Sequence, residues 1–146
     1  MKIITRLGLA GVLASSLALG GCSHMGGGGN EQTWTLHAVD AAPTASGKVE
    51  VATEKNGNHQ VKVEVKRMAP PAKIFDGTSI YVVWLKAEKG SYQNIGTLAI
   101  DKDLNGKLTT KTPFDTFDVL VTAEADALAL TPSDNKVMNT KVQVAS

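Results

Sequence analysis

Disulfide bonds within the chain are excluded, because its 146 residues include a single cysteine, Cys22. A protein without cross-links depends on its apolar core for stability, even in an oxidising compartment. Typical domains contain about 100 to 150 residues, so this length suits one domain. We therefore expect one domain held together by its core, and we expect Cys22 to have a different use.

The chain also lacks a large excess of positive charge, since it has 15 Lys and Arg residues and 14 Asp and Glu residues. Two of the basic residues, Lys2 and Arg6, lie in an N-terminal segment that we expect to be removed. Without them 13 basic residues remain and the net charge is −1. Proteins bind nucleic acids and anionic lipids through clustered basic residues. The composition therefore predicts no nucleic-acid partner.

The apolar runs are too short to span a bilayer, which takes roughly 20 residues. The apolar stretch 7–19 follows Lys2 and Arg6 and ends at Leu19-Gly-Gly-Cys22. A short basic start, a short apolar run and a small-residue finish are typical of a cleaved secretory signal. Leu19 to Cys22 also resembles the lipobox of bacterial lipoproteins, in which a small residue precedes a cysteine that is acylated and becomes the mature N-terminus.

The lipobox resemblance implies a signal peptide at residues 1–21, palmitate or a related acyl group on Cys22, and anchoring to a membrane of the bacterial cell envelope. The alternative is an ordinary cleaved signal followed by a chance cysteine. Residues 22–32 contain Gly26 to Gly29 and only one large apolar side chain, which predicts a flexible tether. Ser23 resembles the residue after the cysteine in lipoproteins sent to the outer membrane. We therefore favour the outer over the inner membrane, with the domain facing the periplasm or the exterior.

Short strand patterns recur through residues 33–146, which form the expected domain. Alternating or continuous apolar residues predict strands at 33–39, 49–51, 61–65, 79–85, 95–100, 108–112, 117–124 and 137–144. Asn56-Gly57-Asn58 predicts a hairpin loop between the second and third of them. About seven or eight short strands without a long helix favour an all-β fold, an antiparallel immunoglobulin-like β-sandwich. A small β-barrel is the alternative.

Two of these strand patterns locate the core. Residues 81–85 are apolar at every position, so both faces of that strand should be covered. In residues 117–124 the odd positions are apolar and the even ones mostly polar, which predicts one buried face. The expected structural core comprises Val83, Trp84, Leu85, Phe117, Val119 and Val121. Four aromatic residues could form a binding platform, namely Tyr81, Trp84, Tyr92 and Phe117. We interpret them instead as part of the core packing.

The pair Asn105-Gly106 predicts a two-residue hairpin turn, because both residue types tolerate positive φ. With Asp101 and Asp103 it also matches the first half of a calcium-binding loop. Such a loop needs a bidentate glutamate at its twelfth position, where this chain has Thr112, and it needs helices on both sides. We therefore interpret Asp101, Asp103 and Asn105 as a polar turn and expect no metal there.

Residues that could carry catalysis are few. His24 lies in the tether, and we expect His37 and His59 on the outward faces of their strands. Asp115 and Asp118 could act as paired carboxylates, but an exposed strand entry is the simpler interpretation. Hydrolysis needs a nucleophile, a base and an orienting group within reach of one another. We expect a protein that is not an enzyme and has no cofactor.

Part of the domain resembles the extracytoplasmic C-terminal domain of membrane-bound anti-sigma factors of the anti-sigma-K type. The resemblance covers roughly residues 79–138 and is carried by segments 81–85, 96–98, 117–124 and Pro132-Ser133. It implies an immunoglobulin-like sandwich outside a membrane, without catalytic residues. Asp134 departs from the glycine that often follows Pro-Ser, and neither a sigma-binding helical domain nor a spanning helix is expected. Regulation of a sigma factor is therefore not transferred.

The anchor, the tether and the β domain together predict an envelope lipoprotein whose domain is a non-catalytic interaction or structural module. Its expected partners are the membrane, through the N-terminal lipid, and another envelope protein. The alternative is a lipoprotein that binds a small ligand or a metal, through Asp101, Asp103 and Asn105 or through the proline-containing loop at 70–79.

Overall fold

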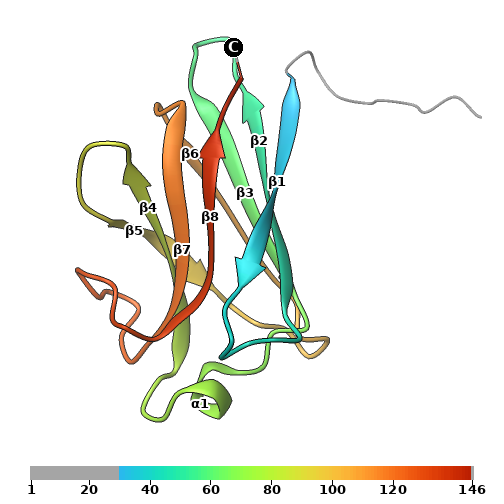
Figure 1. The fold of residues 1–146 in the computed structure, drawn as a ribbon, viewed down its shortest axis with the longest axis vertical. Helices are drawn as coiled ribbons and strands as arrows, with labels where there is room; N and C mark the ends of the chain where they lie inside the picture. The colour runs from blue at the N-terminus through green and yellow to red at the C-terminus, as the bar shows by residue number, and fades with distance from the viewer. Residues whose placement is uncertain (1–29, 146) are drawn as a thin grey trace, which may run out of the picture.

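The computed structural model describes residues 30–145, and eight strands account for most of this part of the chain. The strands are β1 (Glu31–Ala38), β2 (Ser46–Thr53), β3 (His59–Lys66), β4 (Ile80–Ala87), β5 (Gln93–Leu98), β6 (Gly106–Thr112), β7 (Thr116–Glu124) and β8 (Lys136–Gln143) (Figure 1). A helix of one turn, α1 (Pro71–Ile74), begins at the second proline of the proline-containing loop at 70–79. No helix among residues 30–145 is both long and apolar enough to span a membrane.

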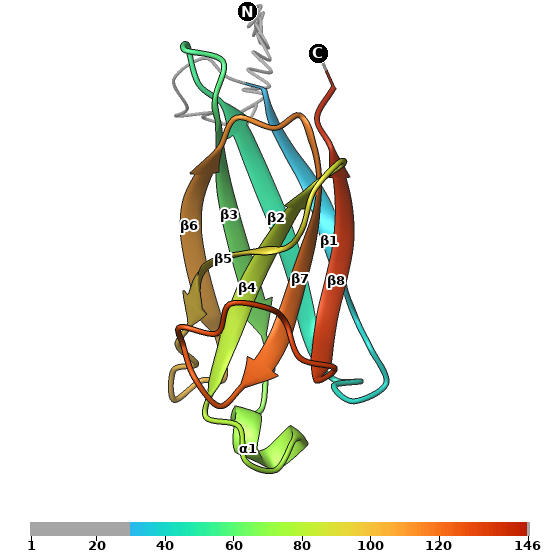
Figure 2. The same cartoon turned by 90° about the vertical axis from the view of Figure 1, so that its left-hand side faces the viewer.

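The strands form one nearly closed antiparallel sheet in the order β5-β4-β7-β8-β1-β2-β3-β6. The first four strands of this order lie on one side of the core and the last four on the other (Figure 2). β1 joins the two layers, because its residues up to Leu36 pair with β2 whereas His37 and Ala38 pair with β8. The predicted all-β antiparallel fold is confirmed, and its near closure fits the barrel-like alternative.

The strand boundaries differ from the predicted ones by up to three residues, and the difference at the N-terminal edge affects the segment interpreted as tether. β1 begins at Glu31, two residues before the expected start of the domain at residue 33. The amide of Gln32 donates to the carbonyl of Ala145 at 3.2 Å and accepts from its N–H at 3.1 Å. These bonds extend the ordered strand into the segment interpreted as tether. The signal peptide and residues 22–29 of the tether, Cys22 included, lie outside the described residues.

The main core fills the space between the two layers, and Val83, Leu85, Phe117, Val119 and Val121 are buried in it. Trp84 is buried as well, but on the other face of β4. There it forms a second cluster with Val82 and Leu120, against which Ile80, Tyr92 and Ala129 pack. The continuous apolar pattern of β4 therefore corresponds to a strand covered on both faces.

The two ends of the domain differ in what they carry. The start of β1, the β2–β3 hairpin and the C-terminus lie at one end (Figures 1 and 2). The helix α1 and the β1–β2 connection lie at the other end, and the β7–β8 connection lies in that half of the domain, folded against the outer face of β4 (Figures 1 and 2). The start of β1 and the β7–β8 connection therefore lie in opposite halves of the domain.

The predicted two-residue turn at Asn105-Gly106 is wrong. β5 pairs with β4 and β6 pairs with β3, so residues 99–105 cross from one layer to the other instead of closing a hairpin. The N–H of Leu104 donates to the carbonyl of Asp101 at 3.0 Å, and Leu104 has the positive φ of 64°. Asn-Gly favours a tight turn locally, but pairing with distant strands determines where this chain turns.

Gly106 is the first residue of β6, where space rather than backbone conformation restricts its side chain. A Cβ atom there would lie 2.9 Å from Ile100 Cδ1 and 3.1 Å from Val65 Cγ2.

We predict that Gly106→Val lowers the free energy of unfolding by about 1 to 3 kcal/mol through overpacking. Urea unfolding of Gly106→Val, Ile100→Ala and the double variant checks this. The double variant should lose less than the sum of the two single losses, because Ile100→Ala removes the atom that lies nearest to the added Cβ. Additive losses would contradict the proposed clash.

The pairing of β4 with β5 contains a bulge beside Gly96. The register between β4 and β5 shifts between Val83 and Trp84, where Gly96 and Asn94 are the successive partners and Ile95 is the extra residue. Gly96 has φ 135°, and a Cβ atom there would lie 3.0 Å from Leu108 of β6. The bulge thus lets the two edge strands of the sheet approach each other through the side chain of Leu108.

Candidate functional site

The residues considered for calcium form a turn held by its own side chain. Asp101 Oδ1 accepts the backbone N–H groups of Asp103 and Asn105, each at 2.9 Å. Within residues 30–145, no group of three or more His, Cys, Asp or Glu side chains is arranged to hold a metal ion. The arrangement of Asp101 matches the polar turn that we interpreted from the sequence.

His59 is not on the surface as expected, because only 3% of it is exposed. Its Nδ1 lies 3.0 Å from Thr53 Oγ1, and its Nε2 lies 2.7 Å from Asp115 Oδ1. His59 is two residues before Val61, so the alternation that buries the valines of β3 also turns His59 inward. The burial of His59 was therefore predictable from the alternation in the sequence. His37 is exposed, as expected.

An imidazole between a hydroxyl and a carboxylate is also found in hydrolase triads. We therefore consider which parts of the fold the two partners of His59 belong to. Thr53 is its partner across the β2–β3 hairpin, and Asp115 belongs to the connection between β6 and β7. The carbonyl of Asp115 accepts the N–H of Val144 at 2.8 Å. His59 and Asp115 thus connect the β2–β3 hairpin, the β6–β7 connection and the residue that follows β8. These segments lie at the end of the domain where β1 begins (Figure 2). Asp118 points elsewhere and lies 4.0 Å from Lys86.

A network of charged side chains covers the outer face of β2, β3 and β6. Glu50 is ion-paired with Lys48 and, at 2.5 Å, with Lys62. Glu64 lies 3.2 Å from Lys48, 3.9 Å from Lys62 and 3.6 Å from Lys107. Apart from its ion pair with Lys62, the buried Oε2 of Glu50 has no hydrogen-bond donor. The network depends on the register of three strands, so the sequence pattern alone did not reveal it.

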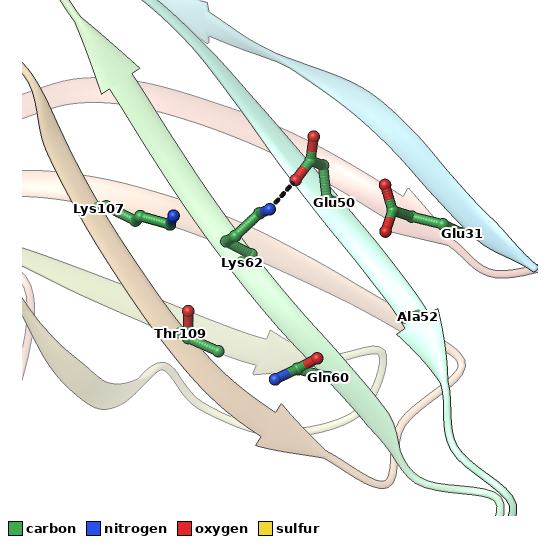
Figure 3. A pocket seen from close by; sticks show the side chains of 7 residues that line it. All are labelled: Glu31, Glu50, Ala52, Gln60, Lys62, Lys107 and Thr109. Atoms are coloured by element: carbon green, nitrogen blue, oxygen red, sulfur yellow. Dashed lines mark ion pairs between the residues drawn. The ribbon is translucent and has the colours of Figure 1, made fainter. Parts of the chain in front are cut away.

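These ion pairs shift the pKa values of their members. Hydrogen bonds from Lys48 and Lys62 hold the pKa of Glu50 below its usual range, and the hydrogen bond from Lys48 does the same for the pKa of Glu64. Hydrogen bonds to Glu50 raise the pKa values of Lys48 and Lys62. Beside the network lies a shallow hollow of about 260 Å³, lined by Glu31, Glu50, Ala52, Gln60, Lys62, Lys107 and Thr109 (Figure 3).

The lowered carboxyl pKa values predict a loss of stability in acid. The stability that they contribute is complete above the unfolded-state value of 4.5 and is lost as the pH falls through the lower folded-state pKa. The melting temperature of the wild type should therefore fall more steeply below pH 4.5 than that of Glu50→Gln. Melting curves between pH 3 and 7 check this, with Glu88→Gln on an exposed turn as control. Equal slopes for wild type and Glu50→Gln would contradict the role of the network.

The connection between β7 and β8, residues 125–135, exposes two large apolar side chains. Leu128 is 80% exposed and Leu130 is 89% exposed. We refer to residues 125–135 as the leucine loop. The sequence pattern correctly indicated a connection here, but it carried no sign that the two leucines face solvent.

Hydrogen bonds hold the leucine loop in a defined conformation. The side-chain amide of Asn94 donates to the carbonyls of Ala127 and Ala129 at 2.9 and 3.0 Å. Asp126 Oδ1 accepts the N–H of Leu128 at 2.9 Å, and the hydroxyl of Ser79 donates to the carbonyl of Ala125 at 3.0 Å. The exposed leucines are therefore carried by a fixed backbone.

A buried polar chain supports the base of the leucine loop. Trp84 Nε1 donates to Thr122 Oγ1 at 2.7 Å, and Thr122 Oγ1 donates to Glu124 Oε1 at 2.5 Å. The same carboxylate oxygen accepts the N–H of Ser133 at 2.9 Å. The expectation that the even positions of β7 face solvent is therefore wrong for Leu120, Thr122 and Glu124, which are buried. The loop folds back over this face and satisfies its polar groups.

Comparison with known protein families found no matching family model. Comparison with curated proteins found no match either. The resemblance to a bacterial lipobox and to the anti-sigma-K type of domain therefore stays a prediction.

Proposed function

We propose that this chain is an envelope lipoprotein whose β domain is a non-catalytic module that binds another envelope protein. The observation that carries the proposal is the leucine loop, in which a fixed backbone exposes Leu128 and Leu130. Large apolar side chains held in one conformation at the surface bind partners at a low cost in ordering entropy.

The shape of the domain supports this role for a chain anchored at Cys22. The described chain begins at one end of the domain, and the leucine loop lies in the opposite half, against the outer face of β4 (Figures 1 and 2). A lipid anchor upstream of β1 would hold the first end at the membrane and leave the leucine loop in the half of the domain farther from it. The outer membrane is the proposed location, with the domain in the periplasm or outside the cell. Sigma regulation is not part of the proposal.

Modification of Cys22 tests the anchor. A buried methylene group contributes about 0.8 kcal/mol, and a single acyl chain binds a membrane only marginally, so two or three chains are needed for stable anchoring. The wild type should be found in the membrane fraction, with a mature mass that includes acyl groups on Cys22. Cys22→Ser should lack this mass, because it has no acceptor sulfur, whereas the control Ser23→Ala should keep it. An unmodified wild-type cysteine, or a wholly soluble wild type, would refute the lipoprotein assignment.

A further inference from the structure

We propose that the leucine loop docks onto a partner protein that offers an apolar recess bordered by lysine or arginine side chains. This inference rests on the proposed function and specifies the chemistry of the partner. It combines three properties of the loop, which are its exposed leucines, its charge and its place in the fold.

The apolar part of the surface is formed by Leu128 and Leu130. Most of the large apolar side chains of the described domain are buried in its two clusters, whereas these two are the most exposed. They lie two residues apart on the same segment. The side-chain amide of Asn94 holds this segment through hydrogen bonds to the carbonyls of Ala127 and Ala129. A recess that accepts both side chains would remove their apolar surface from water without having to order the loop.

The charge of the loop determines what should border that recess. Residues 125–135 contain Asp126 and Asp134, both exposed, and no Lys or Arg. The nearest basic residue along the chain, Lys136, opens β8. Two carboxylates beside an apolar contact are complemented by a basic rim, which favours encounter and correct orientation. They would be repelled by an anionic lipid surface.

The position of the loop also favours a protein over the membrane. A chain anchored upstream of β1 carries the loop in the half of the domain away from its anchor, so a protein reaches the loop more easily than the lipids around the anchor do (Figure 2). The occupant should therefore be a protein that approaches the outer face of β4 at a distance from the anchor.

Photo-crosslinking in cells tests this partner. The full-length chain carries a benzophenone amino acid at position 128, or at the exposed position 55 on the β2–β3 hairpin as control. We expect a protein adduct from position 128 and none of the same mass from position 55. Mass spectrometry should locate the adduct in an apolar segment with Lys or Arg beside it.

Matched variants then test each part of the surface. Asp126→Asn with Asp134→Asn removes the charge but keeps the Oδ1 atom that holds Leu128, so the loop should keep its conformation. We expect the adduct yield to fall about three- to tenfold, the size of effect that exposed charge pairs give. Leu130→Ser should reduce the yield further, with an unchanged melting temperature, because Leu130 is exposed.

The outcomes separate this inference from the function on which it rests. Absence of acyl groups on Cys22 would contradict the lipoprotein assignment. An adduct to lipid, an adduct to a second copy of the chain, or no adduct at position 128 would overturn the inferred partner. So would a protein adduct whose yield is the same when both aspartates are neutralised.

Discussion

Replacement of Val121 by Asp is expected to unfold the domain. Val121 lies in the middle of β7, is fully buried in the main core, and is paired with Val83 on one side and Met138 on the other. A buried charge without a partner costs several kcal/mol. This is comparable to the whole stability of a small domain, about 5 to 15 kcal/mol. The variant should therefore have no folded state at room temperature.

Circular dichroism and a thermal melt measure this outcome. The control is Asn139→Asp, which adds the same charge at an exposed position of the neighbouring strand β8. The control should melt close to the wild type, whereas Val121→Asp should show no cooperative transition. A cooperative melt of Val121→Asp within a few degrees of the wild type would show that Val121 is not in the core.

The second large effect is expected from Trp84→Ala. Trp84 is fully buried in the cluster formed with Val82 and Leu120, and its removal leaves a cavity. Such a substitution costs about 3 to 5 kcal/mol. It also removes the donor to Thr122, at the start of the polar chain that holds Ser133 in the leucine loop. Loss of stability should therefore be accompanied by loosening of the loop.

A matched tryptophan separates the two consequences. Trp34 on β1 is half-buried and packs against the main core, away from the cluster of Trp84. Both Trp84→Ala and Trp34→Ala should lower the melting temperature. Only Trp84→Ala should accelerate hydrogen exchange at the amide of Ser133, measured well below either melting temperature. Protection of Ser133 that is unchanged in Trp84→Ala would show that the polar chain does not hold the loop.

Much of the strand architecture could be predicted from the sequence, because in a half-buried strand apolar residues alternate with polar ones at a period of two residues. The valines of β3 illustrate this, since Val61, Val63 and Val65 all face the core. The same periodicity placed Phe117, Val119 and Val121 inside β7. His59 follows the same rule, because it is two residues before Val61 and turns inward with it, so the outward position predicted for it is wrong.

The features that were missed depend on contacts between residues far apart in the chain. Asn105-Gly106 has the local preference of a tight turn, but β6 pairs with β3 and not with β5, so the chain crosses between layers and turns at Leu104. Thr122 and Glu124 look like outward polar residues of an alternating strand. They are buried because a loop from further along the chain covers them and donates to Glu124.

The amino-acid sequence by itself determined that the domain is all-β, which side chains form most of its core, and which N-terminal residues resemble a lipoprotein signal. These properties follow from local patterns of a few residues. The tertiary structure alone decided that the charged side chains of β2, β3 and β6 form one network and that Leu128 and Leu130 remain exposed on a fixed loop. Strand register and burial depend on which distant segments pack together, and a single strand pattern leaves that choice open.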